Sequence, residues 1–288
     1  MPSTSTRPKP GWSPKTATAA LSERSPENLS VPIATKEDIP VEAAVHMRQF
    51  YLLWCVLLLN TTAGVGVLSQ ASAMIQEMFD GFSASGAALF VALLSMFNMC
   101  GRLVWGSLSD PLGRKATYAL FLSLGPLLYM LIPFAGHMHN MALFVGCFAV
   151  ILSMYGGCFA SMPAYITDLF GPAHVGAIHG RVLTALSLAG VAGAGLVNYM
   201  REYWIGHGEP ASRAYDRTMF IMAGVLVAGF VCNLAVHAID HGEVRQTAKR
   251  RLSIFISHRP AFGALGMVAA AVVVIFVTGV GAGWLLAR

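Results

Sequence analysis

Seven long apolar runs constrain this chain more than any other feature of its sequence. They cover residues 49–77, 83–108, 116–135, 139–168, 175–200, 217–238 and 261–286. Each run is about 20 to 30 residues long, and a helix of that length crosses the roughly 30 Å hydrocarbon core of a bilayer. Eight charged residues fall between Gln49 and Met200. The sequence therefore predicts an all-α membrane protein with the lipid bilayer as its solvent.

Composition excludes several classes of function. Charged residues make up 11% of the chain, against about 25% in soluble domains, so a soluble enzyme is excluded. The net charge of +5 does not indicate a nucleic-acid partner, because lysine and arginine gather in short hydrophilic connections rather than in a basic stripe. A membrane enzyme is disfavoured, since no paired carboxylates or nucleophile constellation lie on one membrane face.

The sequence contains no pattern typical of a metal or cofactor site. All five cysteines lie inside apolar runs at irregular spacing, as buried free thiols do. His137 and His139 share a short loop with no carboxylate or cysteine beside them, which is typical of solvated histidines. We expect no metal, no cofactor and no catalytic residues.

Hydropathy divides the chain into four segments. Residues 1–47 are rich in Pro, Ser, Thr and Ala and predict a disordered lead-in. Residues 48–238 hold six apolar runs and predict a six-helix transmembrane bundle. A basic linker over 239–260 joins the bundle to residues 261–288, where we expect an extra transmembrane helix peripheral to the six.

The distribution of lysine and arginine predicts the orientation. With the N-terminus in the cytoplasm, thirteen of these residues lie in cytoplasmic segments and four lie outside, among them Arg201, Arg213 and Arg217. This bias follows the positive-inside rule. The expected location is the plasma membrane.

An internal repeat supports the six-helix unit. The segment Ala73–Phe79 at the end of the first run matches Ala164–Phe170 at the end of the fourth, with Glu77 aligned to Asp168. Three helices separate the copies, and an odd number of spans forces them into opposite orientations, as in the 3+3 inverted repeats of secondary transporters. Chance similarity between short apolar strings is the alternative.

The loop after the second run carries a recognisable pattern. It reads Gly106-Ser-Leu-Ser-Asp110-Pro-Leu-Gly113-Arg114-Lys115, and predicts a short cytoplasmic hairpin with an aspartate at a helix end, a Pro-x-Gly turn and a basic pair. These residues resemble the cytoplasmic-loop motif of the major facilitator superfamily, with Pro111 in place of its first basic residue.

The resemblance extends to the oxalate/formate antiporter family of that superfamily. The segments that carry it begin at Asn60, Tyr155 and Val175 and run to Ser72, Gly171 and Ala185. It covers residues 40 to 238, which are similar to helices seven to twelve of a twelve-helix fold, and residues 1–47 resemble the central loop. The resemblance implies secondary transport of small organic anions by alternating access. It also implies a partner, either an N-terminal six-helix half or a homo-oligomer.

Arg102 is the first candidate for substrate binding. It lies inside the second run, about 12 Å along the helix from Asp110, where an arginine is expensive unless it faces a polar cavity or a partner. Its planar fork suits a carboxylate, and the resemblance to monocarboxylate porters implies that role. The alternative is an arginine that reaches the cytoplasmic surface or braces backbone carbonyls.

Two departures from the related families limit the substrate class. Asn98 stands where monocarboxylate porters carry an aspartate, so proton coupling through that position is in doubt. Leu186 stands where the oxalate carrier places a lysine, so a dicarboxylate lacks a second cationic anchor. A monocarboxylate such as formate, exchanged or moved without a proton, fits better.

Other polar residues within the runs divide into two sets. The resemblance implies a cytoplasmic gate in which Arg114 pairs with Asp168 and Asp110 faces the other half, with Gly113, Lys115 and Arg181 nearby; interfacial charges satisfied by water are the alternative. The second set contains expected cavity groups that would otherwise leave an amide or hydroxyl in lipid: Asn60, Gln70, Tyr155 and Tyr165. Hydrogen bonding between helices is the alternative for these four. At the level of the whole protein, the alternative to transport is a truncated remnant or modulatory subunit.

Overall fold

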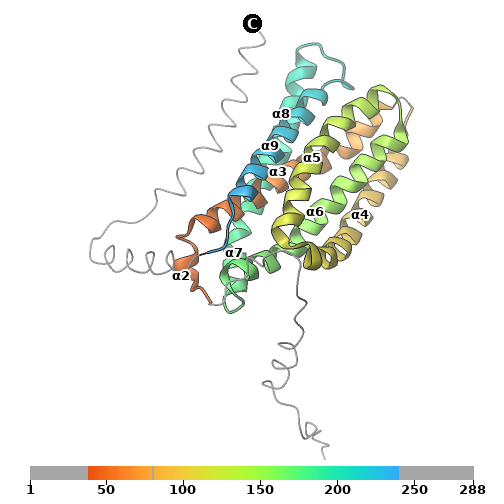
Figure 1. Cartoon of the computed structure of the whole chain (residues 1–288). Helices are drawn as coiled ribbons and strands as arrows, with labels where there is room; N and C mark the ends of the chain where they lie inside the picture. The colour runs from red at the N-terminus through yellow and green to blue at the C-terminus, as the bar shows by residue number, and fades with distance from the viewer. Residues whose placement is uncertain (1–37, 80, 240–288) are drawn as a thin grey trace, which may run out of the picture. The chain divides into compact units, whose positions relative to one another are not determined.

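The computed structural model describes residues 38–79 and 81–239, and the elements in these ranges are helices without strands. A short helix comes first and is followed by the longer ones (Figure 1). The bounds are α2 Val41–Ala44, α3 Arg48–Met78, α4 Ala84–Leu112, α5 Arg114–His137, α6 Met141–Phe170, α7 Val175–Val182, α8 Thr184–Gly206 and α9 Asp216–Ala235.

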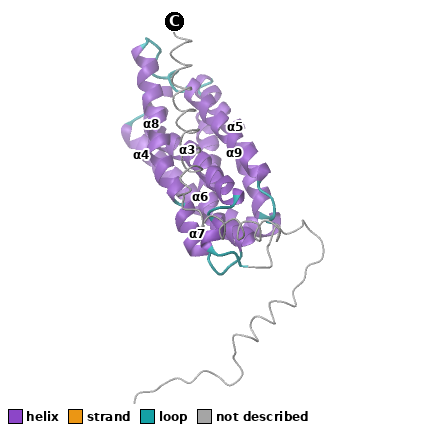
Figure 2. Cartoon of the chain, turned by 90° about the vertical axis from the view of Figure 1, so that its left-hand side faces the viewer, coloured by secondary structure: helices purple, strands orange, loops and turns teal. Residues whose placement is uncertain are grey.

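Six stretches are long and apolar enough to cross a membrane, which confirms the predicted all-α membrane fold. They are α3, α4, α5, α6, the α7–α8 pair and α9. Their axes lie side by side in an elongated bundle (Figure 2). The seventh apolar run, the 239–260 linker beyond Ile239 and the N-terminal segment before Asp38 lie outside the described residues.

Two elements differ from their predicted form. The fifth run breaks at Leu183 into α7 and α8, whose combined length reaches Gly206. The expected hairpin after the second run is shorter than predicted, because α4 continues through Pro111 to Leu112 and α5 begins at Arg114. Gly113 alone joins them, with a φ of 82° that favours glycine.

Residues 38–47 are a correction to the predicted disordered lead-in. The Ile39 amide donates to the Phe170 carbonyl at 2.9 Å, and the Asp38 carboxylate accepts from the Ala173 amide at 2.9 Å. Ile39 and Ala44 are buried. This segment is mostly apolar and docks onto the α6–α7 turn, a signal that the polar composition of residues 1–47 as a whole concealed.

The helices pair in a pattern that follows the sequence repeat. α4 packs along α6, α3 packs along α8, and α5 packs along α9. In the repeat, α3 corresponds to α6, α4 to α7–α8 and α5 to α9. This correspondence turns the α4–α6 pair into the α8–α3 pair, and it turns the α5–α9 pair into itself. The packing therefore has the symmetry that a 3+3 inverted repeat requires.

The closest approaches between helices obey the same relation. A Cβ at position 101 of α4 would lie 2.1 Å from the Ser153 carbonyl oxygen of α6, and a Cβ at position 193 of α8 would lie 2.4 Å from the Thr62 carbonyl oxygen of α3. Thr62 and Ser153 are 91 residues apart, and Gly101 and Gly193 are 92 apart. Glycine at both places lets the backbones touch, as membrane helices require.

The break between α7 and α8 accounts for a shift in the repeat. Gly86 precedes its counterpart Gly176 by 90 residues, whereas Gly101 precedes Gly193 by 92. Two residues are therefore added between these points, and Leu183, where the helix is interrupted, lies within the interval. The uninterrupted α4 is the copy without them.

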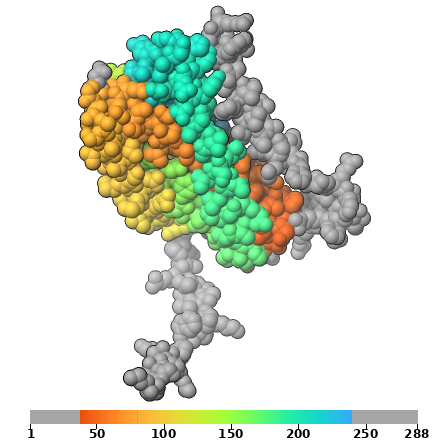
Figure 3. All heavy atoms as spheres, turned by 180° about the vertical axis from the view of Figure 1, so that it is seen from behind, coloured from red at the N-terminus to blue at the C-terminus, as the bar shows by residue number. Residues whose placement is uncertain are grey.

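One side of the bundle, formed by α4 and α8, exposes apolar side chains. Leu103 is 70% exposed and Val191 78% exposed, and Leu89 and Met99 are exposed as well. Figure 3 looks onto this side, with α4 in orange to yellow and α7–α8 in green to teal. We call it the α4–α8 face. The bundle ends are named by their arginines: the Arg114 end holds the α4–α5 and α6–α7 turns, and the Arg201 end holds the α5–α6 and α8–α9 loops.

Candidate functional site

Arg102 lies on the α4–α8 face. Its side chain is exposed, as are its neighbours Met99 and Leu103. Within residues 38–79 and 81–239, its guanidinium forms no ion pair or side-chain hydrogen bond, whereas Arg114, Arg181 and Arg201 each hold at least one acceptor. The five donors of Arg102 are therefore free to bind whatever meets this face.

Asn98 lies one helical turn before Arg102 and is half-buried against α6. A Cβ at position 156 would lie 2.0 Å from the Asn98 carbonyl oxygen and 2.8 Å from its Oδ1. Gly156 therefore makes room for Asn98 at the α4–α6 contact. The amide is held beside the arginine, on the helix that carries it.

Tyr155 of α6 packs against α3 inside the bundle. Its ring lies over Gly64 of α3, where a Cβ would be 2.3 Å from the tyrosine Cδ2. Its hydroxyl is within electrostatic range of Arg102. Tyr155 also lines a small cavity together with Asn60, which is 8% exposed. Asn60 and Tyr155 thus share one cavity, while Asn98 and Arg102 lie one helical turn apart on α4.

Gln70 and Tyr165 lie elsewhere. The Gln70 amide donates to Asn198 Oδ1, which joins α3 to α8. Tyr165 is fully buried, and its hydroxyl donates to Asn233 Oδ1 at 3.2 Å, which joins α6 to α9. Both form the interhelical hydrogen bonds that were the alternative at the sequence level. Tyr165 is therefore corrected from a cavity group to a packing residue.

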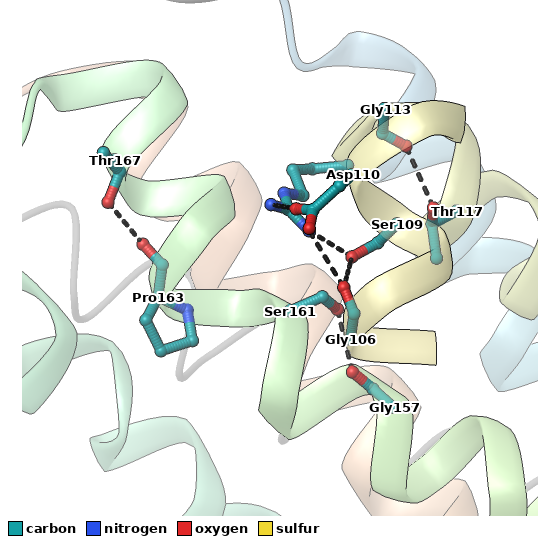
Figure 4. A network of polar contacts seen from close by, with 10 residues as sticks. Gly106, Ser109, Asp110, Gly113, Thr117, Gly157, Ser161, Pro163 and Thr167 are labelled. Carbon is teal, nitrogen blue, oxygen red and sulfur yellow. Dashed lines mark hydrogen bonds and ion pairs between the residues drawn. The ribbon is translucent and has the colours of Figure 1, made fainter. Parts of the chain in front are cut away.

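The residues of the motif Gly106–Lys115 contact one another at the Arg114 end. The Arg114 guanidinium pairs with Asp110, donates to Ser109 Oγ and approaches the Gly106 carbonyl at 3.5 Å. Figure 4 shows Asp110, Ser109 and Gly106 converging on this group. The Arg114 side chain is 16% exposed and that of Asp110 65%. Asp110 and Arg114 are four residues apart and can pair because Gly113 lets α5 begin directly where α4 ends.

The expected ion pair between Arg114 and Asp168 is not formed in the described residues. Asp168, near the end of α6, lies within electrostatic range of both Arg114 and Asp110. Asp110 is the nearer partner because it precedes Arg114 by four residues across a single-residue link, which the sequence pattern for a longer hairpin did not reveal.

Lys115 and Arg181 donate to backbone carbonyls rather than to Asp168. The Lys115 ammonium donates to the Leu234 carbonyl at 3.0 Å and to that of Val236, so it caps the end of α9, where a cation is favoured. Arg181 Nη1 donates to the Ala177 carbonyl at 2.9 Å within α7. Both stabilise helix ends.

A second charged cluster at the Arg201 end was missed from the sequence. Arg201 of α8 pairs with Glu77 of α3 and donates to the Tyr215 hydroxyl at 2.8 Å. Burial, and then the Glu77 carboxylate, raise the pKa of Tyr215 above its ordinary value. The sequence did hold a signal for this cluster. The repeat aligns Glu77 with Asp168, so a carboxylate expected to pair with an arginine at one bundle end indicates a similar role for its counterpart at the other end.

A larger cavity adjoins this second cluster. It measures about 550 Å³ and is lined in part by Glu77, His139 and Arg213. His137 Nε2 lies 2.7 Å from Asp216 Oδ2 at its edge. Among the described residues, no three His, Cys, Asp or Glu side chains are placed to hold a metal ion.

Comparison with known proteins gives relatives that are transporters. The oxalate:formate antiporter of Oxalobacter formigenes is 26% identical over 164 residues, which cover 57% of this chain and 38% of the antiporter. Apicoplast pyruvate carrier 1 of Toxoplasma gondii is 27% identical over 171 residues, or 54% of this chain and 30% of the carrier. Apicoplast pyruvate carrier 2 of the same organism is 32% identical over 101 residues, or 35% and 15%.

The chain spans well under half the length of these relatives. The family model of the Major Facilitator Superfamily matches residues 5–194, more than half of the chain. The six apolar helices and the repeated packing agree with that match. This chain therefore belongs to the Major Facilitator Superfamily.

Proposed function

We propose that this chain is the carboxylate-binding half of a carrier that moves small organic anions by alternating access. The observation that carries the proposal is Arg102, which is exposed on the α4–α8 face and has no acceptor among the described residues. The names of the antiporter and pyruvate-carrier relatives support an anionic substrate of the oxalate, formate or 2-oxo acid type.

The energetics of Arg102 favour a binding role over an interfacial one. An arginine at the centre of a membrane helix costs about 2.5–3.5 kcal/mol or more when it faces lipid. A water-filled cavity against a second protein wall removes most of that cost, and a carboxylate then fits the guanidinium through two parallel hydrogen bonds. The neighbouring Asn98 amide and Tyr155 hydroxyl supply neutral polar groups.

The α4–α8 face is where the second wall belongs. Its exposed side chains around Arg102 are apolar and include Leu89, Leu103 and Val191. Such a surface suits another helical bundle. The partner is either an N-terminal six-helix half or a second copy of this chain. Rocking of the two walls about the arginine would expose the anion to each side in turn.

The substrate class follows from the charges on this face. Between Ala84 and Leu108 of α4, and between Thr184 and Met200 of α8, the single charged residue is Arg102. One cation matches one carboxylate, which favours monocarboxylates over oxalate. Asn98 in place of a carboxylate favours exchange or uniport over proton coupling.

Orientation and gating complete the proposal. The positive-inside rule supports a cytoplasmic location for the Arg114 end, and the proposed membrane is the plasma membrane. There Asp110, Gly113, Arg114, Lys115, Asp168 and Arg181 form the gate-side elements, with Asp168 available to exchange with Asp110 as the Arg114 partner. The proposal includes a basic linker over 239–260 and an additional helix in 261–288.

Counterflow in proteoliposomes tests the function. We would measure the exchange of labelled formate, pyruvate and oxalate by the purified chain, with Arg102→Gln as the test variant. The matched control is Arg48→Gln, which alters an exposed arginine at the start of α3. Uptake abolished by Arg102→Gln and retained by Arg48→Gln supports a carrier that works as a homo-oligomer.

A second arm adds a six-helix N-terminal half from a related carrier to the same liposomes. Uptake that requires this addition identifies a split-carrier subunit. Absence of uptake in both arms contradicts the carrier proposal for these anions. It would favour the alternative, a non-transporting remnant or modulatory subunit, which co-purification with a complete carrier would then test.

A further inference from the structure

A small, partly open cavity lies where four helices meet. Side chains of α3, α5, α6 and α9 line it, among them Asn60, Tyr129, Tyr155 and Leu226. Its volume is about 20 Å³. A space of roughly 10–15 Å³ by this measure holds one water molecule, so the cavity has room for one small group and no more.

Two glycines keep this space open. A Cβ at position 125 would lie 2.9 Å from Leu226 Cδ1, and a Cβ at position 64 would lie 2.3 Å from the Tyr155 ring. Gly64 and Gly125 both line the cavity. Larger residues would either fill it or push Tyr155 away from its present position.

Three polar side chains border the cavity. Tyr129 is 1% exposed, and within the described part of the chain its hydroxyl has no hydrogen-bond partner. By comparison, the buried Tyr118 and Tyr165 hydroxyls each donate to an acceptor. A buried hydroxyl left without a partner destabilises the fold. Asn60, which contacts the Cys158 thiol, and Tyr155 supply the other polar groups.

Tyr155 connects this cavity to the proposed substrate site. Its hydroxyl is within electrostatic range of Tyr129 on one side and of Arg102 on the other. No charged residue lines the cavity, so its occupant is neutral. An empty cavity is expected where the lining is apolar, but here polar groups from three helices converge.

We propose that one water molecule occupies this cavity, bridges Asn60, Tyr129 and Tyr155, and thereby holds Tyr155 in place over Gly64, beside the proposed substrate site. The proposal rests on the proposed function for its consequence at the substrate site, but not for the water itself. Tyr129 is then a positioning residue: it touches neither substrate nor arginine, and acts through the water and Tyr155.

The first experiment detects the water directly. A cryo-EM or crystallographic map of the full chain, at a resolution that shows ordered solvent, should contain one density peak within hydrogen-bonding distance of the Tyr129 hydroxyl and the Asn60 amide. The same map of Tyr129→Phe should lack it. An unoccupied cavity in the unaltered protein overturns the proposal, whether or not the chain transports anions.

The second experiment measures the consequence for binding. In counterflow, Tyr129→Phe should raise KM for formate and for pyruvate by the same factor, about three- to tenfold, while the maximal rate stays within twofold. The control is Tyr118→Phe, which removes a buried hydroxyl outside the cavity and should leave KM unchanged. Equal KM values in Tyr129→Phe and the unaltered protein contradict the positioning role.

The neutral group in the cavity is either a water molecule or the oxo group of the substrate, and a comparison of two substrates distinguishes them. If Tyr129→Phe raises KM for pyruvate but not for formate, the cavity takes the oxo group of the substrate, and the water proposal is wrong. If Tyr129→Phe does not fold, Gly125→Ala replaces it, because the added methyl meets only the mobile end of Leu226 and displaces the water. The same KM increase is expected.

Discussion

Arg201 and Glu77 join α8 to α3 through an ion pair at the bundle end opposite to the Asp110–Arg114 pair. The two pairs are not copies of one another. At the Arg114 end the arginine comes from the start of α5 and its partner from α4, whereas at the Arg201 end the arginine comes from α8 and its partner from α3. Each end of the bundle therefore carries one charged cluster, and the two clusters are built from different elements.

Breaking the Arg201 cluster should destabilise the bundle. Arg201 and Glu77 are 27% and 22% exposed, and removing a hydrogen bond to a charged group costs about 1.5–3 kcal/mol. Glu77→Gln should lower the midpoint of thermal unfolding in detergent by roughly 3–10 °C. The control is Glu209→Gln, whose carboxylate is 4.0 Å from Arg217 and more exposed. Equal midpoints for the two variants would contradict the role of the cluster.

Glycine substitutions should report on the symmetry of the packing. Gly101→Ala and Gly193→Ala each place a methyl against a backbone carbonyl, and overpacking of this kind costs about 1–3 kcal/mol. Because the two contacts are equivalent, the losses of unfolding free energy should be similar. Gly190→Ala and Gly195→Ala are the controls, since a Cβ at either position meets nothing within 4 Å. A loss in the controls as large as in the test pair would sink the interpretation.

The six spans could be predicted because hydropathy over twenty residues is a strong signal in lipid, whereas the repeat was indicated by the match between Ala73–Phe79 and Ala164–Phe170. The break at Leu183 was not predicted, since no proline or glycine stands at that position and the run stays apolar on both sides. The docked segment 38–47 was missed because composition was averaged over residues 1–47, and because the burial of its apolar residues depends on a partner surface far along the chain.

The candidate site was predictable in part. Arg102 stood out because an isolated arginine in an apolar run is rare. It is exposed on the α4–α8 face, and its role in binding stays a prediction. Gln70 and Tyr165 have the same polarity as Asn60 and Tyr155, yet only the latter pair lines the cavity. Their roles depend on which helix each side chain faces, and a nearly uniform apolar background gives little information about that direction.

Variants of the Asp110–Arg114 pair should separate stability from gating. Asp110 is mostly exposed, and an exposed i,i+4 pair contributes about 0.3–0.5 kcal/mol, so Asp110→Asn should leave thermal unfolding nearly unchanged. Arg114→Gln should cost more, about 1–2 kcal/mol, because the half-buried arginine also bonds Ser109. If Asp110 acts in the gate, Asp110→Asn lowers the maximal rate of counterflow several-fold at unchanged stability. A rate equal to that of the unaltered protein would assign the pair to structure alone.

The segment before α3 should act as a brace on the α6–α7 turn. Asp38→Ala removes the acceptor of the Ala173 amide and should cost about 0.5–1.5 kcal/mol. Ile39→Asp should cost more, because it places a charge where a side chain is 2% exposed. The measurement is limited proteolysis between residues 38 and 47, which should accelerate in both variants, with Glu42→Ala as the exposed control. Cleavage at the same rate in all three variants would show that the segment is not held by these contacts, and an accelerated rate with intact counterflow would confine the brace to stability.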